Sequence, residues 1–393
     1  MVSFVSISKG VFFVSMMFIG TSHAAPPSSE VPSDVPQDNS GKPSNFTLPP
    51  LISNRTHPAP PHLKVAGIGG EVQNMEDNIE WLKELGFDYP GMIEREELES
   101  VFGMAIDLPA GVPAVSAKDT LSRFDNGNDI SIAATPEQIN TLAFYAGVIS
   151  TSYCRTVTGL GRWDCKNCQK YVPDGQLIFT FSSPISDTTG FVLRSDSQQT
   201  IHLVFRGTNS IRQSITDLVV TKTDYPPVNG AQVHTGFLAS YNEVVDKYFP
   251  YVQQQLSAFP NYKVIVSGHS LGGAHALLAA LDLYQRDSRF GPDNMSVYTV
   301  GCPRVGDTNF AYYVDATRIP FFRSVHNRDP VPHLPPQAMG FLHAGVEIWD
   351  KTLGGYSICP SNLESQSCSN TIVPLVSFFD HLTYYDINEG LCL

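Results

Sequence analysis

The stretch Tyr262-Lys-Val-Ile-Val-Ser-Gly268-His269-Ser270-Leu271-Gly272-Gly273-Ala274 decides the fold of this chain. It contains the pattern G-x-S-x-G, with a short β-branched run before it and an Ala- and Leu-rich segment after it. These flanks predict a buried parallel strand, a very tight turn and a helix. The turn would hold the Ser270 hydroxyl at its tip, where Gly268 and Gly272 leave room for the neighbouring backbone. We interpret Ser270 as a nucleophile; the alternative is an ordinary glycine-rich turn.

Segments with strand patterns alternate with segments with helical patterns from about residue 130 onward. Such alternation predicts an α/β protein with a mostly parallel central sheet covered by helices. One helix should begin at Thr135-Pro136, where an N-cap residue precedes a proline. The expected strands are residues 177–182, 191–194, 200–205, 263–267, 296–300, 321–326 and 345–349. The expected later helices are residues 237–256, 274–286 and 309–315.

A serine nucleophile needs a base and an acid that orients the base. In this type of fold they follow the serine in the order acid, then histidine, on loops after later strands. Two acids qualify, Asp307 and Asp329. We choose Asp329 because the prolines of Asp329-Pro-Val-Pro332 stiffen its loop and fix the direction of the carboxylate.

Three histidines come after Asp329. His333 lies on the same proline-bounded loop, which leaves it little freedom to face the acid, and His343 precedes the last expected strand. His381 lies beyond that strand, where it can fold back over the edge of the sheet. We therefore expect His381 to be the base. His269 adjoins the nucleophile, but we expect its side chain to point away and to serve in packing.

The oxyanion that forms during acyl transfer needs two or more hydrogen-bond donors. One is the N–H of Leu271, directly after the nucleophile. The other should come from the loop after an early strand, where Gly207 permits close approach and Thr208 offers both an N–H and a hydroxyl.

A short amphipathic segment follows this loop. A capping box predicts a helix that starts at Ser210. We interpret it as a lid over an apolar cleft, and the alternative is a small core helix. Its apolar stripe consists of Ile211, Ile215, Leu218 and Val219, and Asp217 lies on its polar face.

All seven cysteines lie at or beyond Cys154, which indicates an oxidising compartment. Sequence alone does not choose among the possible connectivities. Local spacing favours the pairs Cys165–Cys168 and Cys359–Cys368, which would leave Cys154 to pair with Cys392 and Cys302 free. The Cys165-x-x-Cys168 pair could instead bind zinc or act in thiol redox chemistry, but no second ligand pair follows it. We expect no metal and no cofactor.

The composition narrows the choice of partners. The net charge is −13 and no dense basic stripe is present, so nucleic acid is not an expected partner. Residues 1–24 have the pattern of a signal peptide, with Lys9, an apolar run too short to span a bilayer, and a small-residue cleavage site. The product is therefore expected to be secreted, without a transmembrane segment.

The region between the signal peptide and the α/β domain is not evenly globular. Residues 26–61 are rich in proline, which predicts an extended segment. Residues 71–104 form an acidic amphipathic stretch, which we interpret as part of a propeptide that docks intramolecularly; the alternative is a solvated appendage. The chain is therefore expected to divide into a signal peptide at residues 1–24, a propeptide at residues 25–123 and the α/β domain at residues 124–393. Glycosylation sequons begin at Asn45, Asn54 and Asn294.

From about residue 130 to the C-terminus the chain resembles the filamentous-fungal secreted triacylglycerol lipases of class 3, the Rhizopus/Rhizomucor type. The stretches that carry the resemblance are Val204-Phe-Arg-Gly-Thr-Asn-Ser210, Gly268-His-Ser-Leu-Gly-Gly273, Gly301-x-Pro-Arg-Val-Gly306, Asp329-x-Val-Pro332 and Asp380-His381-Leu382. Cys302 departs from the small residue that is usual there.

The resemblance implies an α/β-hydrolase fold made as a preproenzyme, with the disulfide pairing that local spacing favours. It also implies the triad of Ser270, Asp329 and His381, an oxyanion hole at Thr208 and Leu271, and a lid near residues 210–220. An acyl groove would touch Val331, Leu334 and Leu382.

The expected activity is hydrolysis of long-chain acylglycerol esters at a lipid–water interface by a monomer. Phospholipase A1 and feruloyl or aryl esterase activities are alternatives on the same scaffold. A catalytically inactive binding protein is an alternative of another class, although a competent residue occupies each catalytic position.

Overall fold

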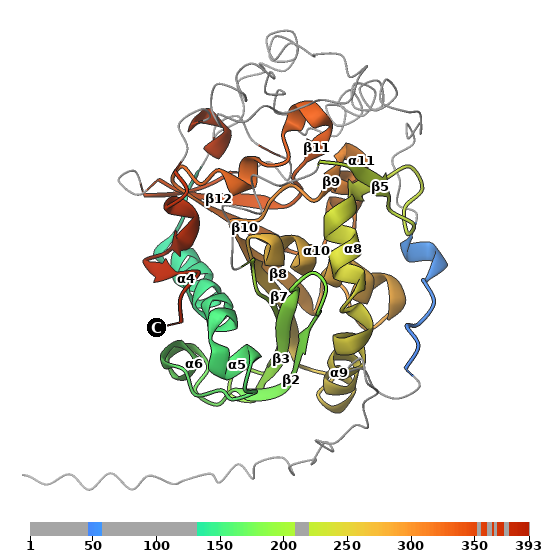
Figure 1. Ribbon diagram of the computed structural model, residues 1–393, viewed down its shortest axis with the longest axis vertical. Coiled ribbons are helices and arrows are strands. Elements are labelled where there is room, and N and C mark those ends of the chain that lie inside the picture. The colour runs from blue at the N-terminus through green and yellow to red at the C-terminus, as the bar shows by residue number, and fades with distance from the viewer. Residues whose placement is uncertain are drawn as a thin grey trace, which may run out of the picture. The chain divides into compact units, whose positions relative to one another are not determined.

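Among the described residues, nine strands form one sheet in the order β1-β13-β12-β10-β8-β7-β4-β3-β2 (Figure 1). The computed structural model describes residues 46–56, 132–208, 220–351, 355–359, 364, 368–372 and 377–392. The central strands β12, β10, β8, β7 and β4 pair in parallel, and the strands at both edges pair antiparallel. The predicted mostly parallel sheet is confirmed. Its strands are β1 (Ile132–Ala133), β2 (Gln176–Ser182), β3 (Thr189–Ser195), β4 (Thr200–Phe205), β7 (Lys263–His269), β8 (Met295–Val300), β10 (Phe321–His326), β12 (Val346–Asp350) and β13 (Tyr356–Ile358).

Strand β7 lies in the interior of the sheet because its sequence suits burial on both faces. Every residue of β7 after Lys263 is buried, as expected of a continuous apolar run in a parallel sheet. Both α4 (Pro136–Ser150) and α10 (Leu271–Arg286) pack against β4, β7 and β8. Figure 1 shows these two helices on opposite sides of the sheet. The other α-helices of the described residues are α5 (Arg155–Thr158), α6 (Lys166–Tyr171), α8 (Thr235–Asn242), α9 (Val245–Ala258) and α11 (Thr308–Ala316).

The predicted start of the first helix is confirmed. The Thr135 side chain accepts a hydrogen bond from the Gln138 N–H, and the Gln138 side chain accepts one from the Thr135 N–H at 2.8 Å. Pro136 occupies the first helical position, where its missing N–H has no intrahelical partner to lose.

The prediction of a single helix over residues 237–256 is wrong, because the chain breaks between α8 and α9. The carboxylate of Glu243 lies at the break and accepts hydrogen bonds from the Ser183 hydroxyl and from the N–H and hydroxyl of Ser186. Both serines belong to the connection between β2 and β3, so a contact distant in sequence fixes this break.

A second sheet was not anticipated from the sequence. Its strands are too short to show a strand period. In the described part of the chain it has the order β11-β9-β6-β5. These strands are β5 (Lys222–Asp224), β6 (Gln232–His234), β9 (Gly306–Asp307) and β11 (Phe341–Leu342), and a separate pair consists of β14 (Thr383–Tyr384) and β15 (Ile387–Asn388).

Disulfides join the cysteines in the pairing that local spacing favours, Cys154–Cys392, Cys165–Cys168 and Cys359–Cys368. The first of these ties the start of the domain to its C-terminal end. Cys302 is free and buried, and burial raises the pKa of its thiol to about 12. At neutral pH Cys302 is therefore an unreactive thiol in the core.

Several predicted segments lie outside the described residues. They are the signal peptide, the acidic stretch at residues 71–104, the boundary at residues 123 and 124, and residues 210–219 of the lid predicted near residues 210–220. Every described residue belongs to one compact unit, Val35–Leu393. Among the described residues, no helix is both long and apolar enough to cross a lipid bilayer.

Glu389, directly after β15, is a fully buried carboxyl group. Neither of its carboxyl oxygens has a hydrogen-bond partner in the part of the chain that the structure describes. Its main-chain N–H donates to the carbonyl of Leu382 at 2.8 Å. Burial raises the pKa of Glu389 well above its usual range, because the surroundings do not solvate a negative charge.

Replacing Glu389 with glutamine should change the pH dependence of stability. The folded protein keeps the Glu389 proton to a higher pH than the unfolded chain does. The contribution of the protonated Glu389 to the free energy of unfolding is therefore fully present below the unfolded pKa. It is lost as the pH rises toward the folded pKa, by up to about 1.4 kcal/mol per pH unit. In urea unfolding, we expect the free energy of unfolding of wild type to fall more steeply than that of Glu389→Gln as the pH rises above the unfolded pKa of about 4.3. Equal slopes would contradict a protonated Glu389.

Candidate active site

Ser270 occupies a strained turn between β7 and α10. Its backbone has φ 56° and ψ −131°, a conformation that L-residues rarely adopt and that carries a strain of about 1–3 kcal/mol. A Cβ on Gly268 would lie 2.2 Å from the carbonyl oxygen of Gly272, and a Cβ on Gly272 would lie 2.4 Å from that of Phe205. The two glycines therefore permit the tight turn, as the sequence predicted.

The predicted acid and base are hydrogen-bonded to each other. Nδ1 of His381, in the 3-10 helix η6 (Asp380–Leu382), lies 2.7 Å from Oδ2 of Asp329, and both side chains are fully buried. Because a carboxylate only accepts, it orients the imidazole with a proton on Nδ1. Nε2 of His381 is buried and has no hydrogen-bond partner among the described residues, so its lone pair is free to receive a proton.

The carboxylate of Asp329 is also held by two further groups. Its Oδ1 accepts a hydrogen bond from the Val331 N–H at 2.8 Å. The hydroxyl of Tyr384 donates to Oδ2. Burial, followed by the nearby Asp329 charge, raises the pKa of Tyr384 well above its usual range, which keeps this hydroxyl a donor. No sequence motif marked Tyr384.

The end of β8 brings the serine beside this pair. The Ser270 N–H donates to the Val300 carbonyl at 3.0 Å. A Cβ on the next residue, Gly301, would lie 2.8 Å from ring atoms of His381 and 3.0 Å from Oδ2 of Asp329. The absence of a side chain at Gly301 thus lets the imidazole pack directly against this strand end.

The rejected candidates have other surroundings. The Asp307 side chain accepts from the Phe310 N–H and caps α11. The buried His343 contacts the Pro332 carbonyl through Nε2 at 2.8 Å. His333 is buried, and within the described residues neither of its ring nitrogens has a partner. Burial lowers the pKa of His333 to about 4, so it is neutral at physiological pH.

The predicted oxyanion donors flank the serine. A Cβ on Gly207 would lie 2.9 Å from the Cβ of Ser270, so the loop after β4 passes directly against the nucleophile. The Thr208 hydroxyl is buried and has no hydrogen-bond partner in the described part of the chain. Leu271 is the first residue of α10, where the N–H groups lack intrahelical acceptors.

A hydrogen-bonded chain through Tyr153 and His269 joins the oxyanion loop to the base. The Tyr153 hydroxyl accepts from the Gly207 N–H at 3.1 Å and lies 2.5 Å from Nδ1 of His269. Nε2 of His269 lies 2.9 Å from the His381 carbonyl and must donate to it. Burial and the neighbouring His381 lower the pKa of His269 well below its usual range, so its ring is neutral. The expectation that His269 serves only in packing is therefore wrong.

A buried ion pair braces the loop that carries Asp329. The guanidinium of Arg304 forms two hydrogen bonds with the carboxylate of Glu364, at 2.7 and 2.6 Å. It also donates to the carbonyls of His333 and Pro335, and the Arg304 N–H donates to that of Leu334. Both charged side chains are buried. Such paired, bidentate contacts fix the geometry of the loop. Loss of one partner would leave the other charge buried without an opposite charge.

The predicted acyl groove touches Val331, Leu334 and Leu382. Val331, in η3 (Val331–His333), and Leu334 are buried, and Leu382 is half-buried in η6. The acyl groove stays a prediction. The predicted lid residues Ser210, Ile211, Ile215, Asp217, Leu218 and Val219 lie outside the described residues.

Two groups of described side chains lie close enough to share a metal ion, but their cysteines are all oxidised in disulfides and offer no thiolate. These groups are Cys154, Cys165 and Cys392, and Glu347, Cys359 and Cys368.

Comparison with known proteins places the chain in a family. The family model for lipase (class 3) matches residues 202–339. The chain is 51% identical over 397 residues to a lipase of Rhizopus oryzae, which covers 100% of both chains. This chain belongs to the lipase (class 3) family. The lipase is also 44% identical to the lipase of Rhizomucor miehei, over 88% of this chain and 90% of that relative.

Solved structures agree with this placement. Lipase II from Rhizopus niveus matches 67% of this lipase and 100% of its own chain, with a TM-score of 0.66 and 60% identity. The native Rhizomucor miehei lipase propeptide complex matches 88% of this lipase and 100% of its own chain, with a TM-score of 0.69 and 42% identity. The predicted α/β-hydrolase fold and the resemblance to this lipase type are confirmed.

Removing the Tyr153 hydroxyl should lower the catalytic activity of the lipase more than its stability. We expect Tyr153→Phe to lower kcat on a soluble ester by about tenfold or more with little change in KM, because the oxyanion loop loses its anchor. Tyr171→Phe is the matched control, since the Tyr171 hydroxyl accepts a hydrogen bond from Lys170 at the surface. An unchanged kcat in Tyr153→Phe would show that the hydrogen-bonded chain has no effect on the reaction.

Proposed function

We propose that this lipase hydrolyses the ester bonds of long-chain triacylglycerols at a lipid–water interface, with Ser270 as nucleophile, His381 as base and Asp329 as the orienting acid. The observation that carries the proposal is the buried Asp329–His381 pair beside the strained Ser270. A relative of known structure is a triacylglycerol lipase whose catalytic centre is a serine protease triad; it is 50% identical to this chain over 67% of it, with a TM-score of 0.65.

In the proposed reaction, Ser270 Oγ attacks the ester carbonyl while His381 Nε2 takes the hydroxyl proton. Asp329 stabilises the resulting imidazolium through Nδ1–H. The N–H of Leu271 and the N–H and hydroxyl of Thr208 donate hydrogen bonds to the tetrahedral oxygen and stabilise its negative charge. His381 then protonates the leaving alkoxide, and a water molecule, activated by His381 in the same way, releases the fatty acid and regenerates Ser270.

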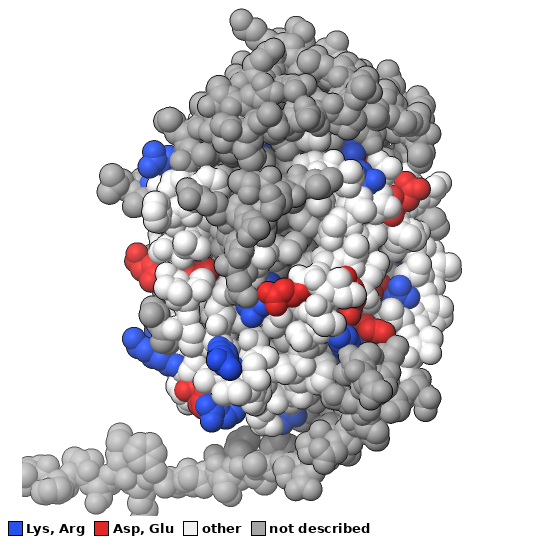
Figure 2. Space-filling view, viewed as in Figure 1, with Lys and Arg blue, Asp and Glu red and all other residues white. Residues whose placement is uncertain are grey.

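The surface near the base supports contact with lipid. Phe379, two residues before His381, has 85% of its surface exposed, which is unusual for so large an apolar side chain. On the face shown in Figure 2, charged side chains of both signs are interspersed with uncharged surface. An exposed aromatic ring beside the site would enter an oil surface at little cost.

We also propose the division into a signal peptide at residues 1–24, a propeptide at 25–123 and the lipase domain at 124–393, with export from the cell. Described residues upstream of position 124 support it, because residues 46–56 lie against the domain. A relative whose structure was solved as a propeptide complex gives further support.

Substrate form should separate this function from its alternatives. We expect rapid hydrolysis of a long-chain triglyceride emulsion, and slower hydrolysis of phospholipid vesicles and of a feruloyl ester. Ser270→Ala should lose on the order of 10⁶ in rate on every substrate while it unfolds like wild type. A clear preference for phospholipid or for the feruloyl ester would overturn the proposed substrate.

The proposed lid should make activity depend on an interface. In water, opening the lid would expose apolar side chains, and exposing each one costs about 1.5–3 kcal/mol. An oil surface removes that cost and shifts the lid toward its open state. We expect the rate on a partly soluble triglyceride to rise steeply above its solubility limit, and Ile215→Asp combined with Leu218→Asp to blunt that rise. A smooth saturation curve in wild type would rule out gating by the lid.

A further inference from the structure

The segment at residues 46–56 is seated on the lipase domain (blue in Figure 1). Phe46 and Leu48 pack against the main hydrophobic core. The Ile52 N–H donates to the carbonyl of Gln285 at 2.7 Å. In the opposite direction, Arg286 donates to the Pro49 carbonyl at 2.7 Å. The segment thus makes both apolar and polar contacts with the domain, and these polar contacts lie at the end of α10.

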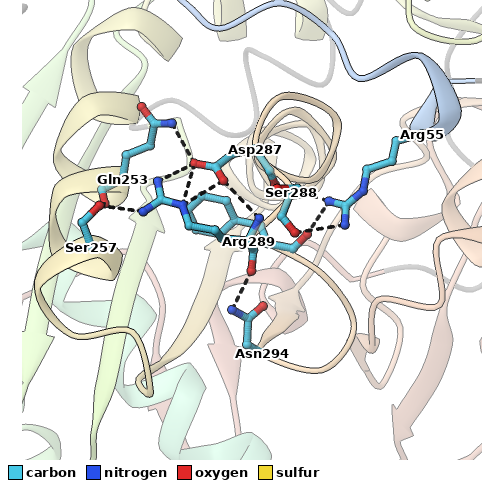
Figure 3. Close-up of polar contacts among 8 residues, drawn as sticks. Arg55, Gln253, Ser257, Asp287, Ser288, Arg289 and Asn294 are labelled. Carbon is cyan, nitrogen blue, oxygen red and sulfur yellow. Dashed lines mark hydrogen bonds and ion pairs between the residues drawn. The ribbon is translucent and has the colours of Figure 1, made fainter.

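Arg55 makes the densest set of contacts in this segment (Figure 3). Its guanidinium donates to four main-chain carbonyls of the domain, those of Tyr284, Asp287, Ser288 and Phe290, at 2.9, 3.3, 3.1 and 2.7 Å. The same guanidinium lies over the ring of Tyr284, 4.4 Å from its centroid. We call these four carbonyls and this ring the guanidinium cradle.

The cradle suits a cation because of its place in the fold. It lies where α10 ends, and the last carbonyls of a helix lack intrahelical donors and carry partial negative charge. An ammonium ion is a compact point charge, whereas a planar guanidinium presents several N–H donors in a fixed fork and stacks on an aromatic ring. Carbonyls spread over the helix end and the following loop therefore favour arginine over lysine.

The loop that carries the cradle is braced by contacts that do not involve Arg55. The carboxylate of Asp287 forms an ion pair with Arg289 and accepts a hydrogen bond from Gln253. Arg289 also donates to the Ser257 hydroxyl, and the Asn294 side chain donates to the Arg289 carbonyl. These contacts, drawn in Figure 3, brace the cradle loop from the side of the lipase domain.

The cradle and the nucleophile lie at opposite ends of α10. The helix has 16 residues, which at the α-helical rise places its ends about 24 Å apart. Arginine bound in the cradle therefore does not cover Ser270.

We propose that the guanidinium cradle is a docking site, separate from the active site, that keeps the propeptide on the folded lipase after the chain is cut between the two. Its ligand is Arg55 within residues 46–56. This inference rests on the proposed division into a propeptide at 25–123 and a lipase domain. The contacts at residues 46–56 persist after such a cut, because no bond that they need is broken.

The test uses the full chain with a protease recognition sequence inserted between residues 123 and 124. The folded protein is immobilised through its C-terminus and cut, and release of the 25–123 fragment is followed during washing. We expect the wild-type fragment to be retained. Its Kd should rise by about 100-fold in Arg55→Ala and about tenfold in Arg55→Lys. Ser53→Ala, an exposed neighbour, is the matched control and should behave as wild type.

A second measurement needs no variant. Acetyl-arginine amide added to the cut wild-type complex should speed release of the fragment, and acetyl-lysine amide should not. Equal retention of the wild-type and Arg55→Ala fragments, or equal release by the two amides, would overturn the proposal. Hydrolysis of a soluble ester is measured in parallel. A lipase domain that stays inactive after the fragment has been washed away would contradict the proposed division, and the release data would still report on the cradle.

Discussion

The backbone of Ser270 is held at φ 56° and ψ −131°, and the geometry of the site depends on that turn. It reverses the chain within one residue, so that β7 ends and α10 begins at the same point. The side chain of Ser270 is thereby presented at the edge where parallel strands end, and the first N–H groups of α10 face the same place. The turn requires glycine at positions 268 and 272, since a Cβ at either position would overlap backbone atoms.

Buried polar contacts then bring distant parts of the chain to this edge. Tyr384 and Asp329 are 55 residues apart, and Tyr153 and His269 are 116 apart. Each contact removes polar groups from water, which is unfavourable unless their partners are well placed. In return, each limits the number of arrangements that the loops can adopt. The site is therefore ordered mainly by side chains that do not touch the substrate carbonyl in the proposed reaction.

Local pattern was sufficient to predict the central strands, the start of α4 and the serine turn, because each depends on neighbours in sequence. The pairing of Asp329 with His381 was predicted from chain order, from the proline-stiffened loop of Asp329 and from the place of His381 beyond the last expected strand. The break at Glu243, the role of His269 and the contributions of Tyr153, Tyr384 and Glu364 depend on contacts between remote segments, and a single sequence gives no signal for these. The lid and the acyl groove remain predictions.

The guanidinium cradle differs from the other contacts in being made almost entirely of main-chain oxygens. A substitution in the lipase domain exchanges a side chain and leaves these oxygens in place. During sequence divergence the domain can therefore change its surface near residues 284–290 while it still recognises the same arginine. Mutations that abolish recognition in one step are concentrated at Arg55 itself. The two parts of this chain thus tolerate mutation unequally, although they share one contact.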